Sequence, residues 1–191
     1  LMAALWGAGI DNAVIELNSP EIPIMDGSSE PFIALIKQAG IKTLQSPRKI
    51  LRILDEIRVG DKKRSAKIIP GDGFAVRFDI DFKDEAIAKQ KTKFNLDESS
   101  FNTEIAAART FCMKSEVEQM HAAGLALGGS LDNAIVVDKG KVLNEDGLRF
   151  EDEFVRHKIL DSVGDLFLAG YRIEGESVSY THLRAHETRY D

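Results

Sequence analysis

Apolar residues recur at helical spacing between residues 152 and 167, which predicts one long helix with a broad buried face. These apolar positions are Phe154, Val155, Ile159, Leu160, Val163, Leu166 and Phe167. Acidic residues at positions 151–153 suit the start of the helix, because carboxylates interact favourably with the positive end of the helix dipole. His157, Asp161 and Asp165 follow at intervals of four. Their side chains therefore share one face of the predicted helix.

Alternating apolar and polar residues predict strands earlier in the chain. The predicted strands cover residues 13–17, 50–59, 65–69 and 74–82, and the last three are expected to be antiparallel. The polar residues 83–93 are expected to form a long excursion without a strand. Residues 134–143 contain a Lys-Gly turn between two apolar segments, which predicts a hairpin.

Capping residues and glycines place the shorter helices. The helix expected after Ser28 or Ser29 has Pro31 in its first turn and Gly40 just beyond its end. A second helix is expected to begin at Asp97 or Ser99 and to run to about residue 109. The third is expected over residues 115–123, and residues 1–6 resemble the interior of a fourth. Strands followed by helices indicate the α+β fold class.

Composition narrows the class of protein. The chain has 191 residues, of which 43% are hydrophobic and 29% charged, enough to bury the core of one large or two small domains. No run of 18 apolar residues is present, so no transmembrane segment is expected. The formal charge of −6 argues against a general nucleic-acid-binding protein. A single cysteine, Cys112, excludes internal disulfides and cysteine-rich metal sites, and fits a reducing compartment.

The pair His157 and Asp161 is the strongest candidate for chemistry. An imidazole and a carboxylate one helical turn apart, beside a buried face, can hold a metal ion on a rigid support. The alternative is a histidine that is satisfied within an acidic helix. For the isolated spacing this alternative is the commoner one.

The sequence around this helix changes that balance. Residues 144–161 read NEDGLRFEDEFVRHKILD and are followed by Gly-Asp-Leu at 164–166. Together with three earlier segments they resemble the zinc-dependent deacetylases of lipid A synthesis, the UDP-3-O-acyl-N-acetylglucosamine deacetylase family. The earlier segments are GIDN at 9–12 with EIPIMDGS at 21–28, ARTF at 108–111, and residues 124–143 with LGGS at 127–130. Four motifs in the same order, between residue 1 and about residue 177, leave little room for chance similarity.

The resemblance implies a fold and an activity. The fold would be α+β, a two-domain sandwich with helices packed between sheets. Residues 1–46 would end the first domain, which is only partly present, and residues 47–178 would form the second, with an inserted unit at about 113–143. The activity would be hydrolysis of the N-acetyl group of UDP-3-O-(3-hydroxyacyl)-N-acetylglucosamine, with release of acetate. The family implies a monomeric, cytoplasmic enzyme whose partner is this UDP-acyl-sugar.

The same resemblance assigns the reacting residues. His157 and Asp161 match two of three ligands of a Zn²⁺ ion, for which Fe²⁺ is a possible substitute. Asp165 matches an acid that orients a catalytic histidine, although as bare sequence it is equally well an exposed helix acid. Thr110 matches a residue whose hydroxyl stabilises the oxyanion, although a threonine at a helix end is more often a cap. Lys158 matches a lysine that contacts the substrate.

Further positions match substrate contacts. Asp81 and Phe82 lie where the family binds uracil, although Phe82 on its own is an ordinary strand residue. Phe111 is placed beside the substrate, and Lys63 or Arg64 falls only loosely near a lysine that approaches the diphosphate. The resemblance implies that the inserted unit lines a passage for the acyl chain, with local packing as the alternative. Its lining residues would be Met113, Val117 and Met120.

Both ends of the chain depart from the family pattern. A Glu-His pair, supplying the general base and the third zinc ligand, would directly precede Leu1, so we expect an N-terminal truncation. Residues 179–191 replace a Ser-Gly-His loop and a helix, and are expected to be non-native and poorly packed. His182 and His186 in this tail are not expected to bind metal. The alternative function is a catalytically dead fragment or a binding module that keeps only the nucleotide and acyl surfaces.

Overall fold

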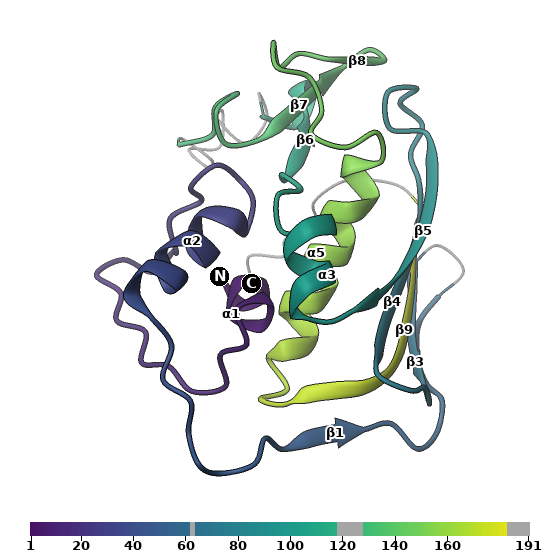
Figure 1. Ribbon diagram of the computed structural model, residues 1–191. Helices are drawn as coiled ribbons and strands as arrows, with labels where there is room; N and C mark the ends of the chain where they lie inside the picture. The colour runs from purple at the N-terminus through teal and green to yellow at the C-terminus, as the bar shows by residue number, and fades with distance from the viewer. Residues whose placement is uncertain (62–63, 118–127, 183–191) are drawn as a thin grey trace.

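The computed structural model describes residues 1–61, 64–117 and 128–182 (Figure 1). Helices and strands mix in an α+β arrangement, as predicted. The helices are α1 (Met2–Gly7), α2 (Glu30–Ala39), α3 (Glu98–Glu104) and α5 (Glu153–Phe167). The strands are β1 (Ile50–Arg52), β2 (Ile57–Gly60), β3 (Arg64–Ile69), β4 (Phe74–Asp81), β5 (Lys89–Leu96), β6 (Phe111–Met113), β7 (Ile135–Asp138), β8 (Lys141–Val142) and β9 (Arg172–His182).

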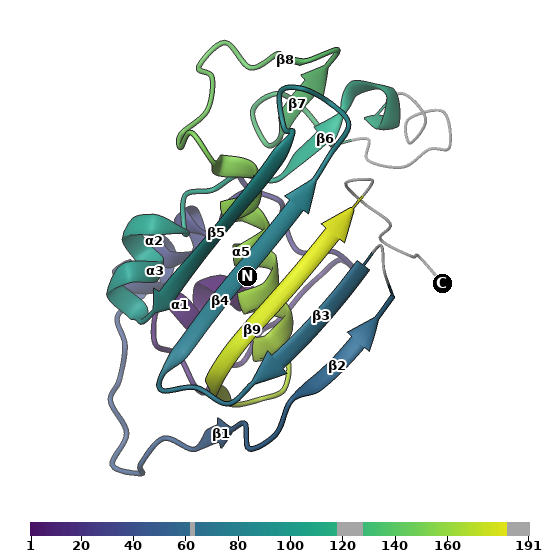
Figure 2. The same ribbon diagram turned by 90° about the vertical axis from the view of Figure 1, so that its right-hand side faces the viewer.

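The main sheet has the strand order β2-β3-β9-β4-β5, and β1 pairs with the first residues of β9. Figure 2 shows this sheet facing the viewer, with the helices behind it. β4 alternates between buried apolar and half-buried polar residues, so Val76 and Ile80 point toward the helices. Arg77 and Asp79 lie on the opposite face and form an ion pair there.

Helix α5 is the central element of the helical layer, and it packs against both the sheet and α1. Its apolar positions Phe154, Ile159 and Val163 are completely buried, which confirms the predicted helix and its buried face. Gly164 permits the close contact with α1, because a Cβ atom there would lie 3.3 Å from the backbone nitrogen of Ala3. The face of α5 that carries His157 is thereby fixed relative to the N-terminal helix.

A small second sheet of order β6-β7-β8 lies at the end of the molecule where α5 begins (Figure 1). The predicted hairpin at 134–143 is confirmed as β7 and β8. Lys139 and Gly140 have φ values of 49° and 76° at its turn, the left-handed conformations that a tight hairpin requires. Gly140 also donates its backbone N–H to Asp84 Oδ2 at 3.0 Å, which ties the hairpin to the loop after β4.

Two of the shorter helices agree closely with the sequence. α2 follows Ser29, carries a proline in its first turn, and ends before Gly40. α3 begins after Asp97, whose side chain accepts from the Ser100 N–H in a capping box. α1 confirms the helix expected at the start of the chain. α3 ends at Glu104, earlier than expected. Residues 114–117 are helical, and the rest of the helix predicted at 115–123 lies outside the described residues.

Three expectations about strands are wrong. Residues 13–17 form no strand, and Val14 is 90% exposed. Residues 83–93 are not a continuous excursion, because β5 begins at Lys89 and pairs along the whole of β4. Finally, the strand expected over residues 50–59 is divided into two strands, β1 and β2. β3 and β4 run antiparallel, as expected, but they are not neighbours. β9 lies between them, antiparallel to β3 and parallel to β4.

The start of the departing tail also differs from expectation. We expected poor packing from residue 179, but residues 179–182 complete β9 and Ser179 is buried. Residues 183–191, including His186, lie outside the described residues, and the remaining division into domains stays a prediction. Within the described ranges the only sheet besides the main one is the small β6-β7-β8 sheet, and the two-domain sandwich stays a prediction. In the same ranges, no helix combines the length and hydrophobicity needed to cross a bilayer.

Candidate functional site

His157 is held by a backbone contact from a distant part of the chain. Its side chain is buried, and Nδ1 lies 3.0 Å from the carbonyl oxygen of Ala108. A carbonyl oxygen can only accept, so Nδ1 is the nitrogen that donates. In the neutral imidazole this leaves the lone pair on Nε2. The fold therefore selects the ring nitrogen that is available to a ligand.

That nitrogen faces a carboxylate oxygen, since His157 Nε2 lies 3.3 Å from Asp161 Oδ1. With the neutral ring oriented as above, two lone pairs face each other, which is unfavourable unless a cation lies between them. Zinc bonds to nitrogen and oxygen of about 2.1 Å, arranged tetrahedrally, separate two ligand atoms by about 3.4 Å. The observed separation fits two ligands of one ion. A doubly protonated imidazole that donates to the carboxylate fits the same distance.

Two charged residues flank this pair. Lys158 Nζ lies 2.8 Å from Asp161 Oδ2 and 5.5 Å from the centroid of the Phe111 ring. Lys158 therefore binds the carboxylate oxygen that does not face His157. Asp165 lies one turn further along α5 and keeps an exposed face. Surrounding protein atoms raise the pKa of the Asp165 carboxyl by desolvation, the Asp161 charge raises it further, and Lys158 opposes the shift.

Thr110 lies close to His157, because it belongs to the same segment as Ala108, whose carbonyl contacts the His157 ring. It follows Ala108 by two residues, which limits its distance from the Ala108 carbonyl to about 7 Å. Its backbone N–H donates to Gly27 O and its carbonyl accepts from Ile135 N–H, both at 2.8 Å. Gly27 is required there, because its φ is +83° and a Cβ atom would lie 2.2 Å from the backbone oxygen of Asn133.

The residues predicted to contact substrate are more scattered. Phe82 and Phe111 are 9% and 1% exposed, and their rings pack against each other with centroids 5.7 Å apart. Both rings therefore pack in the core of the described residues, and their assignment to substrate contacts stays a prediction. Asp81 pairs with Lys89 at 3.4 Å on the outer face of the sheet. Met113 and Val117 are half-buried, Arg64 begins β3, and Met120 and Lys63 lie outside the described residues.

A buried ion pair between Arg109 and Glu153 is part of the same neighbourhood and was not expected. Glu153 is completely buried, and its Oε1 accepts from Arg109 Nε at 2.9 Å. The acids at 151–153 had been interpreted only as partners of the helix dipole, which is wrong for Glu153. No pattern in the sequence indicates that the arginine of the ARTF segment pairs with an acid in the first turn of α5. The pairing spans 44 residues.

Cys112 contributes no ligand. Burial raises the pKa of its thiol to about 11, and the charge of Glu116 raises it further. The thiol is therefore protonated at neutral pH, whereas metal binding and nucleophilic attack need the thiolate. Among the described residues, no group of three His, Cys, Asp or Glu side chains could surround one metal ion. Within this part of the chain, His157 and Asp161 are thus two possible ligands without a third.

We expect Cys112 to be unreactive toward a thiol-modifying reagent in the folded protein at neutral pH, because it is both buried and protonated. The same chain in denaturant should react at the rate of a free cysteine, which serves as the control. Labelling can be followed by mass spectrometry. Rapid modification of the native protein would contradict the buried position of β6.

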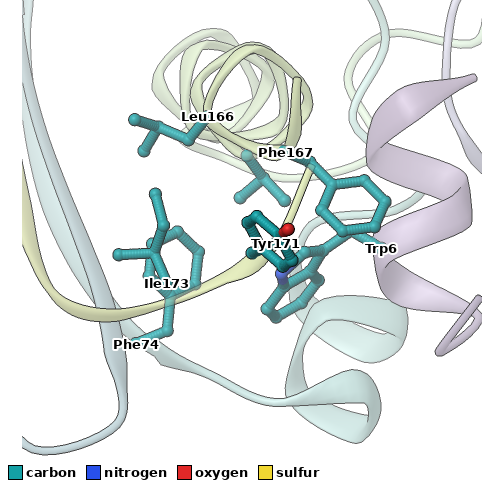
Figure 3. Close-up of a pocket in the computed structure, with 7 residues that line it drawn as sticks. Trp6, Phe74, Leu166, Phe167, Tyr171 and Ile173 are labelled. Carbon is teal, nitrogen blue, oxygen red and sulfur yellow. The ribbon is translucent and has the colours of Figure 1, made fainter. Parts of the chain in front are cut away.

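A shallow apolar hollow lies elsewhere, between α1, the C-terminal end of α5 and the start of β9. Figure 3 shows Trp6, Phe167, Tyr171 and Ile173 gathered around it. It leaves no room for a water molecule. Phe167 is ten residues beyond His157 on α5, which places the hollow about 15 Å along the helix from the metal-ligand pair. The hollow is a seam between packed side chains and not a substrate pocket.

The comparison with known proteins decides the family. Residues 1–189 match the family model described as UDP-3-O-acyl N-acetylglycosamine deacetylase. The chain belongs to this family. His157, Asp161 and Lys158, which the resemblance assigned to this deacetylase family, lie together at one site with the Thr110 segment beside them.

Curated relatives agree with the family. The chain is 52% identical over 182 residues to a protein named UDP-3-O-acyl-N-acetylglucosamine deacetylase from Actinobacillus succinogenes. It is 50% and 51% identical to proteins of the same name from Mannheimia succiniciproducens and Shewanella violacea. Each alignment covers 94% of this chain. The chain spans 60% of the length of these deacetylase-family relatives.

Proposed function

We propose that the protein is a metal-dependent amide hydrolase that removes the N-acetyl group from UDP-3-O-(3-hydroxyacyl)-N-acetylglucosamine. The products are acetate and the free amine, a step of lipid A biosynthesis. The observation that carries the proposal is the 3.3 Å approach of His157 Nε2 to Asp161 Oδ1, with Nδ1 committed to the Ala108 carbonyl. Family membership supports the same substrate, because the relatives bear this name.

His157 and Asp161 would hold the metal ion, which we propose is Zn²⁺ with Fe²⁺ as a possible substitute. When bound, such an ion lowers the pKa of a coordinated water to about 7 and polarises a carbonyl group. The Ala108 carbonyl keeps the imidazole in the tautomer that exposes Nε2. Lys158 neutralises and orients the Asp161 carboxylate through Oδ2, and its ammonium group is available to a substrate oxygen at the same site.

Thr110 would donate its hydroxyl hydrogen to the oxygen that becomes negative as the acetyl carbonyl is attacked. Donors placed at the position of developing charge stabilise the transition state more than the ground state. Asp165 would orient a catalytic histidine, as the family pattern implies.

The substrate contacts beyond the reacting group remain proposals. Asp81 and Phe82 are assigned to the uracil ring, and Phe111 is assigned to a substrate contact. Met113, Val117 and Met120 are assigned to the acyl chain, for which the adaptable methionine side chains are suited. We further propose a monomeric, cytoplasmic enzyme whose partner is the UDP-acyl-sugar and no nucleic acid.

The test is acetate release from UDP-3-O-(3-hydroxyacyl)-N-acetylglucosamine by the chain extended at both ends to the length of its relatives. We expect release with Zn²⁺ and none after chelation. Thr110→Ala should lower kcat by about 10²–10³-fold, because one oxyanion donor is lost. Thr110→Ser keeps the hydroxyl and should keep most of the activity. Equal activity of the alanine and wild-type enzymes would remove Thr110 from the mechanism. A protein that binds the nucleotide sugar without releasing acetate would support a binding module instead.

A further inference from the structure

The buried pair of Arg109 and Glu153 has no part in the proposed chemistry, although it lies next to the residues that do. Their side chains are 8% and 0% exposed. Replacing a buried ion pair with apolar residues of similar volume is often neutral or stabilising, so such a pair is weak support for a purely stabilising role. Fixing one arrangement of the polypeptide is a role that buried pairs can fill.

Within the described residues, this carboxylate accepts hydrogen bonds from Arg109 and Arg149, through two backbone N–H groups and the Arg109 guanidinium. Glu153 Oε1 accepts from the backbone N–H and from Nε of Arg109, each at 2.9 Å. Oε2 accepts from Arg109 Nη2 at 3.1 Å and from the Arg149 backbone N–H at 2.6 Å. Arg109 Nη2 also donates to the Gly147 carbonyl at 2.7 Å. The pair thus joins residues 147–149 and residue 109 to the first turn of α5.

Arg109 lies between two residues of the proposed site, so the Arg109–Glu153 pair can affect both of them. Arg109 separates Ala108, whose carbonyl receives the His157 Nδ1–H, from Thr110. Glu153 precedes His157 by four residues and therefore lies one turn away on the same face of α5. The Arg109–Glu153 contact and the Ala108–His157 contact consequently join the same two segments, one helical turn apart.

We propose that the Arg109–Glu153 pair is a positioning element of the metal site. It holds the Ala108 carbonyl at the distance that keeps the hydrogen of His157 on Nδ1, and so presents the Nε2 lone pair to Asp161. The inference rests on the proposed function for its purpose, since it assigns the exposed Nε2 to a metal ion. Neither residue touches substrate or metal. Their action is through His157.

Glu153→Gln is the informative variant, because it keeps the size of the side chain. A glutamine presents one oxygen and one NH₂ group where the carboxylate presents two oxygens, so N–H donors of Arg109 and Arg149 would face another donor. The segment 108–110 should loosen. The matched control is Arg156→Gln. Arg156 also lies on α5 and binds a distant segment through an acid, with Nη1 2.9 Å from Glu104 Oε2. Its hydrogen bonds go to Asp152 and Glu104 and its guanidinium packs on Phe94 and Phe150, so within the described residues its contacts do not include the segment 108–110.

The experiment measures the tautomer of His157 in the metal-free chain, by long-range ¹H–¹⁵N correlation at mildly alkaline pH. Signals of His157 among the four histidines are identified by their loss in His157→Gln. The wild-type chain and Arg156→Gln should show a single tautomer with the hydrogen on Nδ1. Glu153→Gln should show both tautomers. Its zinc affinity should fall by about 10–100-fold, the usual effect of losing a contact that orients a metal ligand.

Every outcome decides the proposal. An unchanged tautomer and unchanged zinc affinity in a folded Glu153→Gln would overturn it. Equal effects in Arg156→Gln would overturn it too, because any ion pair of α5 would then suffice. Loss of the fold in Glu153→Gln, seen by circular dichroism, would make the pair a requirement of folding and not of the site. A tautomer change in a chain that binds no zinc in any form would refute the proposed function but leave the positioning of His157 intact.

Discussion

Replacing Phe154 with alanine is expected to lower the free energy of unfolding by about 3–5 kcal/mol, the usual cost of truncating a buried phenylalanine. Phe154 is completely buried at the start of α5, and its ring meets Phe111 edge to face with centroids 4.9 Å apart. Removing the ring opens a cavity between α5 and β6. For a domain of this length the midpoint of thermal unfolding should fall by roughly 6–20 °C.

Leu168→Ala is the matched control for Phe154→Ala. Leu168 follows the same helix but is 68% exposed, so its truncation should change stability by no more than about 0.5 kcal/mol. Both variants can be compared by chemical denaturation. Equal stability losses would mean that α5 does not pack as described. Because the Phe111 ring contacts both Phe154 and Lys158, the Phe154 variant should also weaken the site.

The second large effect concerns the metal ligands. In the chain extended to the length of its relatives, His157→Ala and Asp161→Ala should each nearly abolish turnover. Each change removes a ligand, and with it both the activation of water and the polarisation of the carbonyl. The loss should exceed the 10²–10³-fold expected for Thr110→Ala. Lys158→Ala should act partly through a higher KM, because it removes a contact made in the ground state as well.

The relative rates of the Thr110→Ala and His157→Ala enzymes test the prediction most strictly. A Thr110→Ala enzyme that is slower than the His157→Ala enzyme would show that the row on α5 is not the metal site. Thermal unfolding of each variant provides the control, since a ligand on the partly exposed side of α5 can be removed without opening the core. Asp161 suits this comparison best, because its side chain is 38% exposed.

The part of the fold that could be predicted from sequence is the part with local signals. The apolar spacing of α5, the cap of α3 at Asp97 and the Lys139-Gly140 turn each act within a few residues. The shared face of His157, Asp161 and Asp165 follows directly from the helix. These elements were predicted correctly because nothing distant overrides their local preference.

The errors arise where pairing is distant or where polar residues hide a strand. β5 carries Lys89, Lys91 and Lys93 on its solvent face, and Thr92 on the inner face is only half-buried, so its alternation is faint. β9 lies between β3 and β4 although it follows β4 in the sequence by about a hundred residues, and no local pattern predicts such a pairing. The antiparallel directions of β3 and β4 could therefore be expected, but the position of β9 between them could not.

The same reason explains what was missed at the site. The charges of Arg109 and Glu153 each have an ordinary local explanation, and only the packing of the ARTF segment against α5 brings them together. The requirement for Gly27 is equally non-local, because it depends on the Asn133 backbone. The burial of Phe111 is non-local in the same way, because it depends on Phe82 and Phe154, which come from other elements.

The most direct test of the metal site is a calorimetric titration of the 191-residue chain with Zn²⁺, repeated for His157→Ala and Asp161→Asn. Since the described residues supply two ligands at one place, we expect weak, one-to-one binding that is reversed by dialysis. The zinc affinity of each variant should fall by more than roughly 100-fold, which is the upper end of the loss expected when only a contact that orients a ligand is removed. Zinc binding that is unchanged in both variants would contradict the assignment of His157 and Asp161 as the metal ligands.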